Sequence, residues 1–147
     1  MYCIDIINGP NLGNLGEREP HIYGSRTWDE CFLELKTIFS DAEITYFHSN
    51  HEGSIIDRIY WDKENVDAII INAGAYSHTS IAIADAIRSV SIPVVEVHIS
   101  NIMKRESFRH HSYISEVAYS TICGFGVDGY RLAIDGVINY LEQNNRF

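Results

Sequence analysis

The sequence predicts an α/β fold, in which a doubly wound five-stranded parallel sheet is covered by helices on both faces in three layers. Five short apolar runs rich in β-branched residues alternate with helical patterns along the chain. The run from Ala68 to Ile71 is continuously apolar, as expected for a strand covered on both faces. No repeat or low-complexity linker divides the 147 residues, so we expect one domain spanning 1–147.

The first half of the chain carries two expected strands, each followed by a helix. The first strand, Tyr2 to Ile7, ends at the turn-forming Asn8-Gly9-Pro10. Thr27 to Glu30 is a capping box, in which the Thr27 hydroxyl accepts from the Glu30 amide while Glu30 reaches back. The next helix has an apolar face made of Phe32, Leu35, Ile38 and Phe39. A second strand, Ile44 to Phe47, precedes a helix containing Ile55, Ile56 and Ile59.

The second half adds three strands and two helices. After the strand at 68–71, a helix follows Ser77-His78-Thr79 and carries Ile81, Ala84, Ile87 and Val90. Pro93 opens a strand from Val94 to Val97, where a missing amide is tolerated. A short strand, Thr121 to Cys123, leads to a final amphipathic helix from Tyr130 to Leu141. Five βα units in this length favour a flavodoxin-like sheet with strand order 2-1-3-4-5.

Composition narrows the class of protein. The net charge of −9 argues against a nucleic-acid partner, which needs a basic face to displace counterions. No apolar run is long enough to span a membrane, and the N-terminus has no secretory signal pattern. The odd number of cysteines, Cys3, Cys31 and Cys123, and their wide spacing favour buried free thiols. We therefore expect a cytoplasmic protein.

Three loops hold the unusual polar residues. Right-handed crossovers bring the loops after strands 1, 3 and 4 to one edge of the sheet, where ligands bind at the reversal of strand order. Those loops contain these polar residues: Asn8, Asn11, Arg18, Tyr23, Asn72, Ser77, His78, His98, Ser100, Asn101, Arg105 and Arg109. Their convergence predicts a polar ligand site at that edge.

Glu96 and His98 stand two residues apart on an interior strand, so both point to one face. A buried carboxylate is costly unless it is paired, and an imidazole is a natural partner whose tautomer the carboxylate fixes. The pair suits a general acid. Taken alone, it has about even odds of being a structural ion pair; with the converging loops, we favour a catalytic role.

The loop from Gly13 to Gly24 has the composition of a lid. A guanidinium at Arg18 would favour the tyrosinate of Tyr23, which makes that phenol a plausible base. Loop composition alone favours an ordinary phenol and a solvated arginine. After His98, backbone amides at Ile99, Ser100 and Asn101, with Arg105 and Arg109 on a short helix, can hold a carboxylate.

Two other patterns are interpreted as structural. Gly124 to Gly129 matches G-x-G-x-x-G, but no strand follows its helix, so we expect a tight turn with close packing and no bound dinucleotide. The histidines His48, His51, His110 and His111 lack metal-ligand spacing, and we expect surface or capping roles for them and no metal.

Three segments resemble the type II 3-dehydroquinate dehydratase family. They are NGPNLGNLGEREPHIYG at 8–24, NAGAYSHTS at 72–80 and EVHISNIMKRESFRHHS at 96–112, and Asn50 to Gly53 also fits. Similarity in order and spacing covers nearly the whole chain. The sequence departs from the family pattern at three positions: Gly13 stands where Asn is common, Trp28 where Leu is common, and Ser120 where Gly is frequent.

The resemblance implies dehydration of 3-dehydroquinate to 3-dehydroshikimate through an enolate, in the shikimate pathway or quinate breakdown. By carry-over, Tyr23 is the base, Arg18 promotes its ionisation, Asn11 stabilises the enolate through a water, and His98, oriented by Glu96, protonates the leaving hydroxyl. The residues that hold substrate are Asn72, His78, Ile99, Ser100, Arg105 and Arg109, with Asp85 supplied by a neighbouring subunit.

The family also implies trimers, usually assembled into a dodecamer. The reaction needs a base, an acid and oxyanion stabilisation, and we expect no cofactor. Two rival hypotheses are a flavodoxin-like module that binds a flavin or nucleotide, and an inactive oligomer with the same fold. The Asn-Gly-Pro-Asn loop has too few hydroxyls and glycines for the first, and the presence of Tyr23, Arg18 and His98 together speaks against the second.

Overall fold

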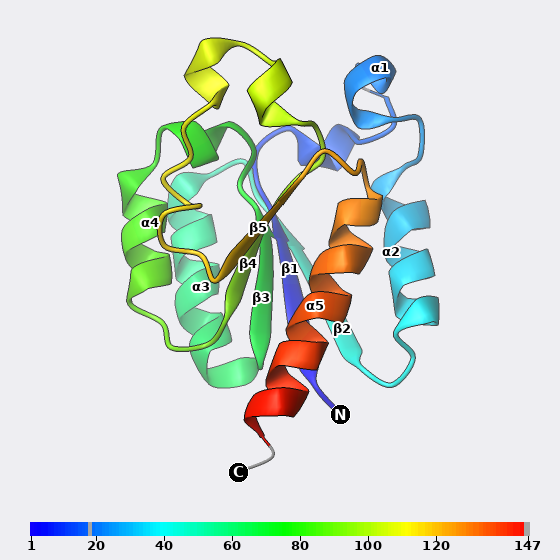
Figure 1. Cartoon of the computed structure of the whole chain (residues 1–147), viewed down its shortest axis with the longest axis vertical. Coiled ribbons are helices and arrows are strands. Elements are labelled where there is room, and N and C mark those ends of the chain that lie inside the picture. Colours follow the sequence, from blue (N-terminus) through cyan, green and yellow to red (C-terminus); the bar gives the residue numbers. More distant parts are fainter. Residues whose placement is uncertain (18, 146–147) are drawn as a thin grey trace.

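The sheet lies at the centre of the computed structural model, which describes residues 1–17 and 19–145, with only the backbone of Tyr23 (Figure 1). Its strand order, β2-β1-β3-β4-β5, is the predicted one, and every neighbouring pair is parallel. The strands are β1 (Cys3–Asn8), β2 (Glu43–His48), β3 (Ala68–Asn72), β4 (Val94–His98) and β5 (Ser120–Cys123). Each expected strand is therefore confirmed to within about one residue at either end.

Helices cover both faces of the sheet. On one face lie α2 (Trp28–Ile38) and α5 (Asp128–Asn144), and on the other α3 (Glu52–Asn65) and α4 (Ile81–Arg88) (Figure 1). Alternate residues of the central strands pack into two separate apolar cores, so that Ile6 and Ile70 face α5 while Ile7 and Ile71 face α3 and α4. Short elements stand above the carboxyl edge of the sheet: α1 (Pro20–Tyr23), η1 (Leu12–Asn14), η2 (Gly74–His78), η3 (Ile102–Lys104) and η4 (Ser107–Arg109).

The start of α2 is as predicted, and so is its buried face except at Ile38. Thr27 accepts from the Glu30 amide and Glu30 accepts from the Thr27 amide, both at 3.2 Å, which confirms the capping box. Leu35 is buried, and Phe32 and Phe39 pack against the same core, whereas Ile38 is 46% exposed. The sequence did not identify Trp28 as part of this face, although it is buried and packs on Tyr46 and Tyr130.

The other differences are small. Phe39 lies just beyond the end of α2, and Val90 lies beyond the end of α4. Cys31 is the fully buried thiol, while Cys3 and Cys123 on the strands are half-buried, contrary to expectation; in the described part of the chain all three are free. None of the helices described there has the length and apolar content needed to cross a bilayer.

Two glycines allow close approaches that the sheet edge requires. A Cβ on Gly9, after β1, would lie 2.4 Å from the carbonyl oxygen of Ala73, after β3. A Cβ on Gly129 would lie 3.2 Å from the Val97 side chain on β4. The G-x-G-x-x-G segment therefore forms a tight turn that packs α5 against the sheet, as expected.

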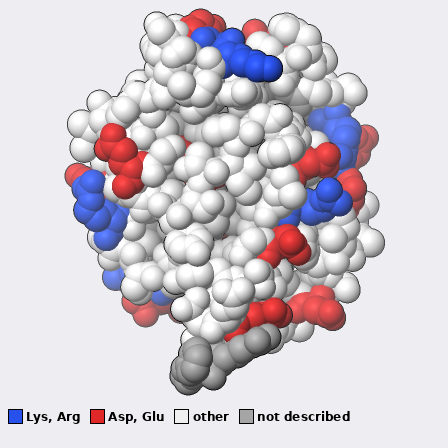
Figure 2. Space-filling view, viewed as in Figure 1, with Lys and Arg blue, Asp and Glu red and all other residues white. Residues whose placement is uncertain are grey.

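Charged side chains of both signs are scattered over the face shown in Figure 2. Lys and Arg atoms lie at the top of the molecule, above the carboxyl edge of the sheet, with Asp and Glu atoms beside them, and both signs occur on the flanks. Asp and Glu atoms are prominent at the opposite end, near the last turns of α5.

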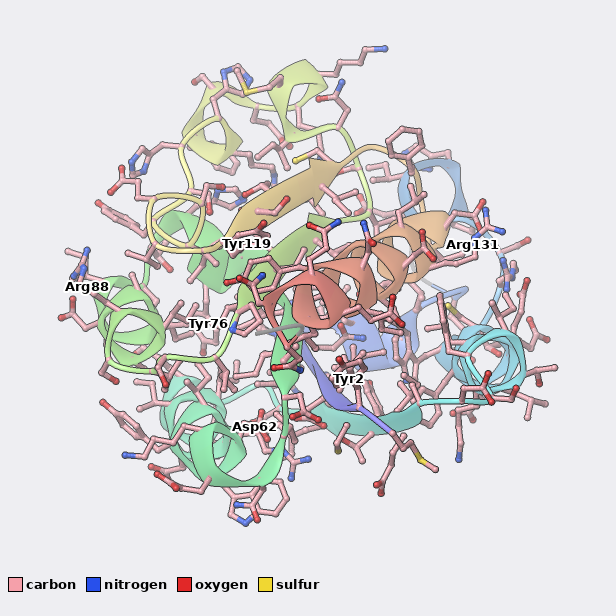
Figure 3. The ribbon with its side chains drawn as sticks, turned by 60° about the horizontal axis from the view of Figure 1, so that its bottom comes forward. Tyr2, Asp62, Tyr76, Arg88, Tyr119 and Arg131 are labelled. Carbon is pink, nitrogen blue, oxygen red and sulfur yellow. The ribbon has the colours of Figure 1, made fainter. Side chains whose placement is uncertain are left out.

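A buried carboxyl pair joins β1 to α3 at the other side of the sheet. Asp5 and Asp62 are both fully buried, and Asp62 is labelled in Figure 3. Arg58 donates to Asp5 from Nε and Nη2 at 2.9 Å. The Arg58 Nε also lies 3.3 Å from the Asp62 carboxyl. Burial, and then the charge and hydrogen bond of Asp5, raise the pKa of Asp62 to about 8, against the opposing effect of Arg58.

This pair predicts a pH-dependent stability. The folded pKa of Asp62 lies above its unfolded value, so its favourable contribution is complete at acid pH and is lost as the pH rises toward 8. Relative to wild type, Asp62→Asn should become more stable with rising pH, by about 1–3 kcal/mol between about pH 5 and pH 8. Urea denaturation at fixed protein concentration measures this difference; a difference that does not change with pH contradicts the raised pKa of Asp62.

Candidate functional site

A pocket opens at the carboxyl edge of the sheet, where the strand order reverses between β1 and β3. It encloses about 690 Å³ of empty space, part of it open to solvent, which suits a small molecule. The predicted site residues that line it come from all three converging loops: Asn11, Asn72, His78, His98, Ile99, Ser100, Arg105 and Arg109. The structure therefore brings these residues of the three loops together, while Asn8, Ser77 and Asn101 do not line the pocket.

The β1 loop reaches the pocket through a strained backbone. Asn11 adopts a left-handed conformation with φ of 69°, and its amide donates to the Asn50 side chain at 3.0 Å. Asparagine tolerates this region better than most residues because its short polar side chain bonds locally. The turn places Asn11 on the pocket wall, and Leu12 and Leu15 beside it give that wall apolar surface.

His98 and Glu96 form the predicted pair at the end of β4. The Nε2 of His98 lies 2.9 Å from the Oε2 of Glu96, within ion-pair distance. Glu96 is fully buried, while His98 is 5% exposed and lines the pocket. The carboxylate therefore lies behind the imidazole, away from a ligand, where it can fix the orientation of the ring.

Three hydroxyls surround the buried carboxylate of Glu96. Ser112 and Ser115 donate to its two oxygens, and Thr121 on β5 donates at 3.2 Å. Burial alone would raise the pKa of Glu96. The hydrogen bond and charge of His98, together with the two serine hydroxyls, outweigh burial and leave the pKa below its ordinary value. Glu96 is therefore an anion at neutral pH.

His78 lies beside His98 at the pocket, with the two rings stacked and their centroids 5.9 Å apart. Its Nδ1 is 2.8 Å from the carbonyl oxygen of His111, which can only accept, so this nitrogen carries the proton. Burial, with the nearby cations His98 and Arg109, lowers the pKa of His78 despite the carbonyl bond. The neutral ring is left with Nε2 to accept a hydrogen bond from a ligand hydroxyl.

The segment after β4 supplies positive charge. The expected short helix containing Arg105 and Arg109 is wrong: two separate 3₁₀ turns form, with Arg105 between them and Arg109 at the end of the second. Arg105 lies 3.4 Å from the Ser100 hydroxyl, and Arg109 pairs with Glu106 at 2.9 Å. Among the described residues that line the pocket, none is Asp or Glu. The pocket therefore suits an anion within an acidic protein.

The predicted site residues not yet described are Arg18, Tyr23 and Asp85. Arg18 and the side chain of Tyr23 lie outside the described residues. Asp85, on α4, is paired at 2.9 Å with Arg88, which Figure 3 labels, and it does not line the pocket of its own chain. Of the four histidines expected at the surface or at caps, His51, His110 and His111 are exposed, while His48 is half-buried beside Gly13.

Comparison with known proteins fits this geometry. A family described as Dehydroquinase class II matches residues 2–138. The chain belongs to this family. A 3-dehydroquinate dehydratase of Prochlorococcus marinus is 50% identical over 140 residues, covering 94% of this chain and 97% of the relative. A 3-dehydroquinate dehydratase of Gloeothece citriformis is 53% identical over 147 residues, covering 97% and 95%.

Solved structures of class II dehydroquinases have the same fold. The crystal structure of a type II dehydroquinase from Butyrivibrio crossotus is 45% identical and superposes with a TM-score of 0.90. The superposition covers 92% of this chain and 97% of that one. The family membership and the α/β architecture predicted from the sequence are therefore both confirmed.

The sequence did not identify every residue of this class II dehydroquinase site. The hydroxyls of Ser115 and Thr121 reach Glu96 from 19 and 25 residues away in the chain, and no spacing rule connects them. Ser112 is the last residue of the third segment that resembles the family, so the sequence marked it as notable. That pattern did not show that its hydroxyl binds Glu96. Tyr130, at the start of α5, was expected only to begin a helix.

The hydroxyl cage around Glu96 gives a prediction. Ser112→Ala removes one donor, so the pKa of Glu96 should rise and the protein should lose about 1–3 kcal/mol of stability at neutral pH. The loss should shrink as the pH falls, because the wild-type benefit disappears once Glu96 is protonated. Carboxyl NMR titration and urea denaturation measure both effects, with exposed Ser107→Ala as control. An unshifted Glu96 titration would contradict the assignment.

Proposed function

We infer that this protein is a type II 3-dehydroquinate dehydratase, a lyase that removes water from 3-dehydroquinate to give 3-dehydroshikimate. The observation that carries the inference is the Glu96–His98 pair facing a cationic pocket at the strand reversal, in a chain of the class II dehydroquinase family. The reaction breaks one C–H and one C–O bond, forms one C=C bond and releases water, so it needs an acid and a base but no oxidant.

His98 is the general acid of this proposal. The leaving hydroxyl must take a proton as its C–O bond breaks, and the imidazole that lines the pocket is the group placed to give it. Glu96, held as an anion by its hydroxyl donors, lies 2.9 Å from the Nε2 of His98 and orients the ring for the transfer. Because Glu96 is behind the ring and fully buried, it acts on His98 and not on the substrate.

Tyr23 and Arg18 supply the base in this proposal, and Asn11 helps to stabilise the enolate. These roles rest on the match of the 8–24 segment to the family pattern. The position of the neighbouring backbone supports them, since Glu19 and Ile22 of the same turn line a second hollow together with Ile99 and Ser100. The turn that carries Tyr23 therefore borders the site.

Substrate is held by groups that complement a carboxylate and several hydroxyls. Arg105, Arg109 and the Ser100 hydroxyl, with the backbone amides of Ile99 and Ser100, suit the carboxylate. His78, as a neutral acceptor, and Asn72 suit hydroxyl groups. Neutral and cationic partners in one pocket allow a charged, polyhydroxylated ring to be bound and oriented.

We also propose that the site is completed by a second copy of the chain, within trimers that assemble into a dodecamer. Asp85 is 63% exposed and lies outside its own pocket. Ile81, one turn earlier on α4, is an apolar side chain left 58% exposed. The exposed Ile81 lies beside Asp85, whose carboxylate is outside the pocket of its own chain. Together they support a subunit contact at this helix. The predicted cytoplasmic location stays a prediction.

The activity is tested with purified protein and 3-dehydroquinate. Ultraviolet absorbance should rise as the conjugated enone forms, and the rise should persist with a metal chelator. His98→Ala and Tyr23→Phe should each lower kcat by about 100-fold or more, as expected for loss of an acid or a base. Exposed His51→Ala should retain wild-type rates. No absorbance rise from folded wild-type protein would exclude this substrate.

Subunit sharing is tested by complementation. Asp85→Ala and His98→Ala should each have little activity alone. In randomly mixed oligomers, about one site in four combines an intact His98 with an intact neighbouring Asp85, and activity should return in that proportion. Mixed oligomers as inactive as their parents would show that Asp85 does not act across a subunit contact.

A further inference from the structure

Tyr130 joins the ends of the two central strands behind the pocket. It lies in the first turn of α5 and is fully buried. Its hydroxyl donates to the Oδ1 of Asn8 at 2.8 Å and accepts from the Nδ2 of Asn72 at 2.9 Å. Asn8 and Asn72 are direct partners in the parallel pairing of β1 with β3, so one phenol bridges two amides that stand side by side.

The bridge fixes which way the Asn72 amide points. A backbone N–H can only donate, and the amide of Gly74 donates to the Oδ1 of Asn72 at 3.2 Å. The Nδ2 of Asn72 must then face Tyr130, whose hydroxyl accepts from it and gives its own proton to Asn8. Of the two Nδ2 hydrogens, one is used by Tyr130 and the other is left for a ligand.

The phenol is itself held in one place and one protonation state. Its ring packs edge-on against Trp28 with the centroids 4.9 Å apart. Burial raises the pKa of Tyr130 far above its ordinary value, more than the hydrogen bonds of Asn72 and Asn8 lower it. A neutral hydroxyl with a fixed donor and a fixed acceptor direction is therefore present throughout the pH range of an assay.

We propose that Tyr130 is a positioning residue for the dehydration, orienting the Asn72 amide so that its free N–H points to a substrate oxygen. This inference rests on the proposed function and adds a residue that does not touch the pocket, since Asn72 lines it and Tyr130 does not. Because the Tyr130 hydroxyl already fixes the Asn72 side-chain amide, that amide loses little conformational freedom when substrate binds. Its hydrogen bond to substrate therefore contributes more to affinity than that of a freely rotating amide.

The test uses Tyr130→Phe, which keeps the ring on Trp28 and removes only the hydroxyl. KM for 3-dehydroquinate should rise about tenfold, the effect of losing one oriented hydrogen bond, while kcat changes less than about threefold. The pH profile of kcat should not move, because the Glu96–His98 pair lies on the other face of β4. A purely structural role predicts less active protein with an unchanged KM, and that outcome overturns the proposal.

A double-mutant cycle identifies Asn72 as the intermediary. In an Asn72→Ala background, adding Tyr130→Phe should leave KM within about twofold, because the group to be positioned is absent. A second tenfold rise there overturns the proposal. Tyr46→Phe is the matched control: its ring also packs on Trp28 and its hydroxyl also faces Asn8, but it does not reach Asn72. This variant should keep the wild-type KM.

These outcomes separate the inference from the function on which it rests. Wild-type protein without dehydration activity contradicts the proposed function. Active wild-type protein, with KM raised by Asn72→Ala but not by Tyr130→Phe, leaves the function intact and overturns the positioning role alone. Asn72→Ala with a wild-type KM removes the assumed substrate contact and overturns the inference while the dehydratase activity stands.

Discussion

A buried anion at Glu96 is the interaction on which the rest of the site depends. A carboxylate inside a parallel sheet is unstable unless its charge is compensated, and here one imidazole and three hydroxyls compensate it. The donors come from β4, from the segment that follows η4 and from β5. Satisfying the carboxylate therefore holds that segment over the edge of the sheet, and His98 and His78 lie stacked side by side at the pocket.

The chain contains a second buried carboxyl cluster, and it is stabilised in a different way. Glu96 is surrounded by donors, so its pKa falls below the ordinary value. Asp62 faces another carboxyl and a single arginine, so its pKa rises to about 8. Both carboxyls are buried, and the contrast follows from their neighbours: the charge of Asp5 raises the pKa of Asp62, whereas the hydrogen bond and charge of His98, with the serine hydroxyls, lower that of Glu96.

Much of the fold could be predicted because its signals are local. The alternation of β-branched runs with helical patterns gave the five strands and their order, and the Thr27–Glu30 box gave the start of α2. The apolar face of α2 was predicted except at Ile38, but the packing of Trp28 against Tyr46 and Tyr130 was not. Helical spacing shows that an apolar face exists but does not show what fills the gap beneath it.

The sequence by itself determined the family, the sheet topology and the set of polar residues that meet at one edge. These follow from local patterning, from the right-handed crossover rule and from long motifs in register. Only the tertiary structure decided how those residues are held: the hydroxyls around Glu96, the carbonyl that fixes the tautomer of His78, and the phenol of Tyr130 between Asn8 and Asn72. Such contacts join residues far apart in the chain, and their geometry exists only once the helices have packed on the sheet.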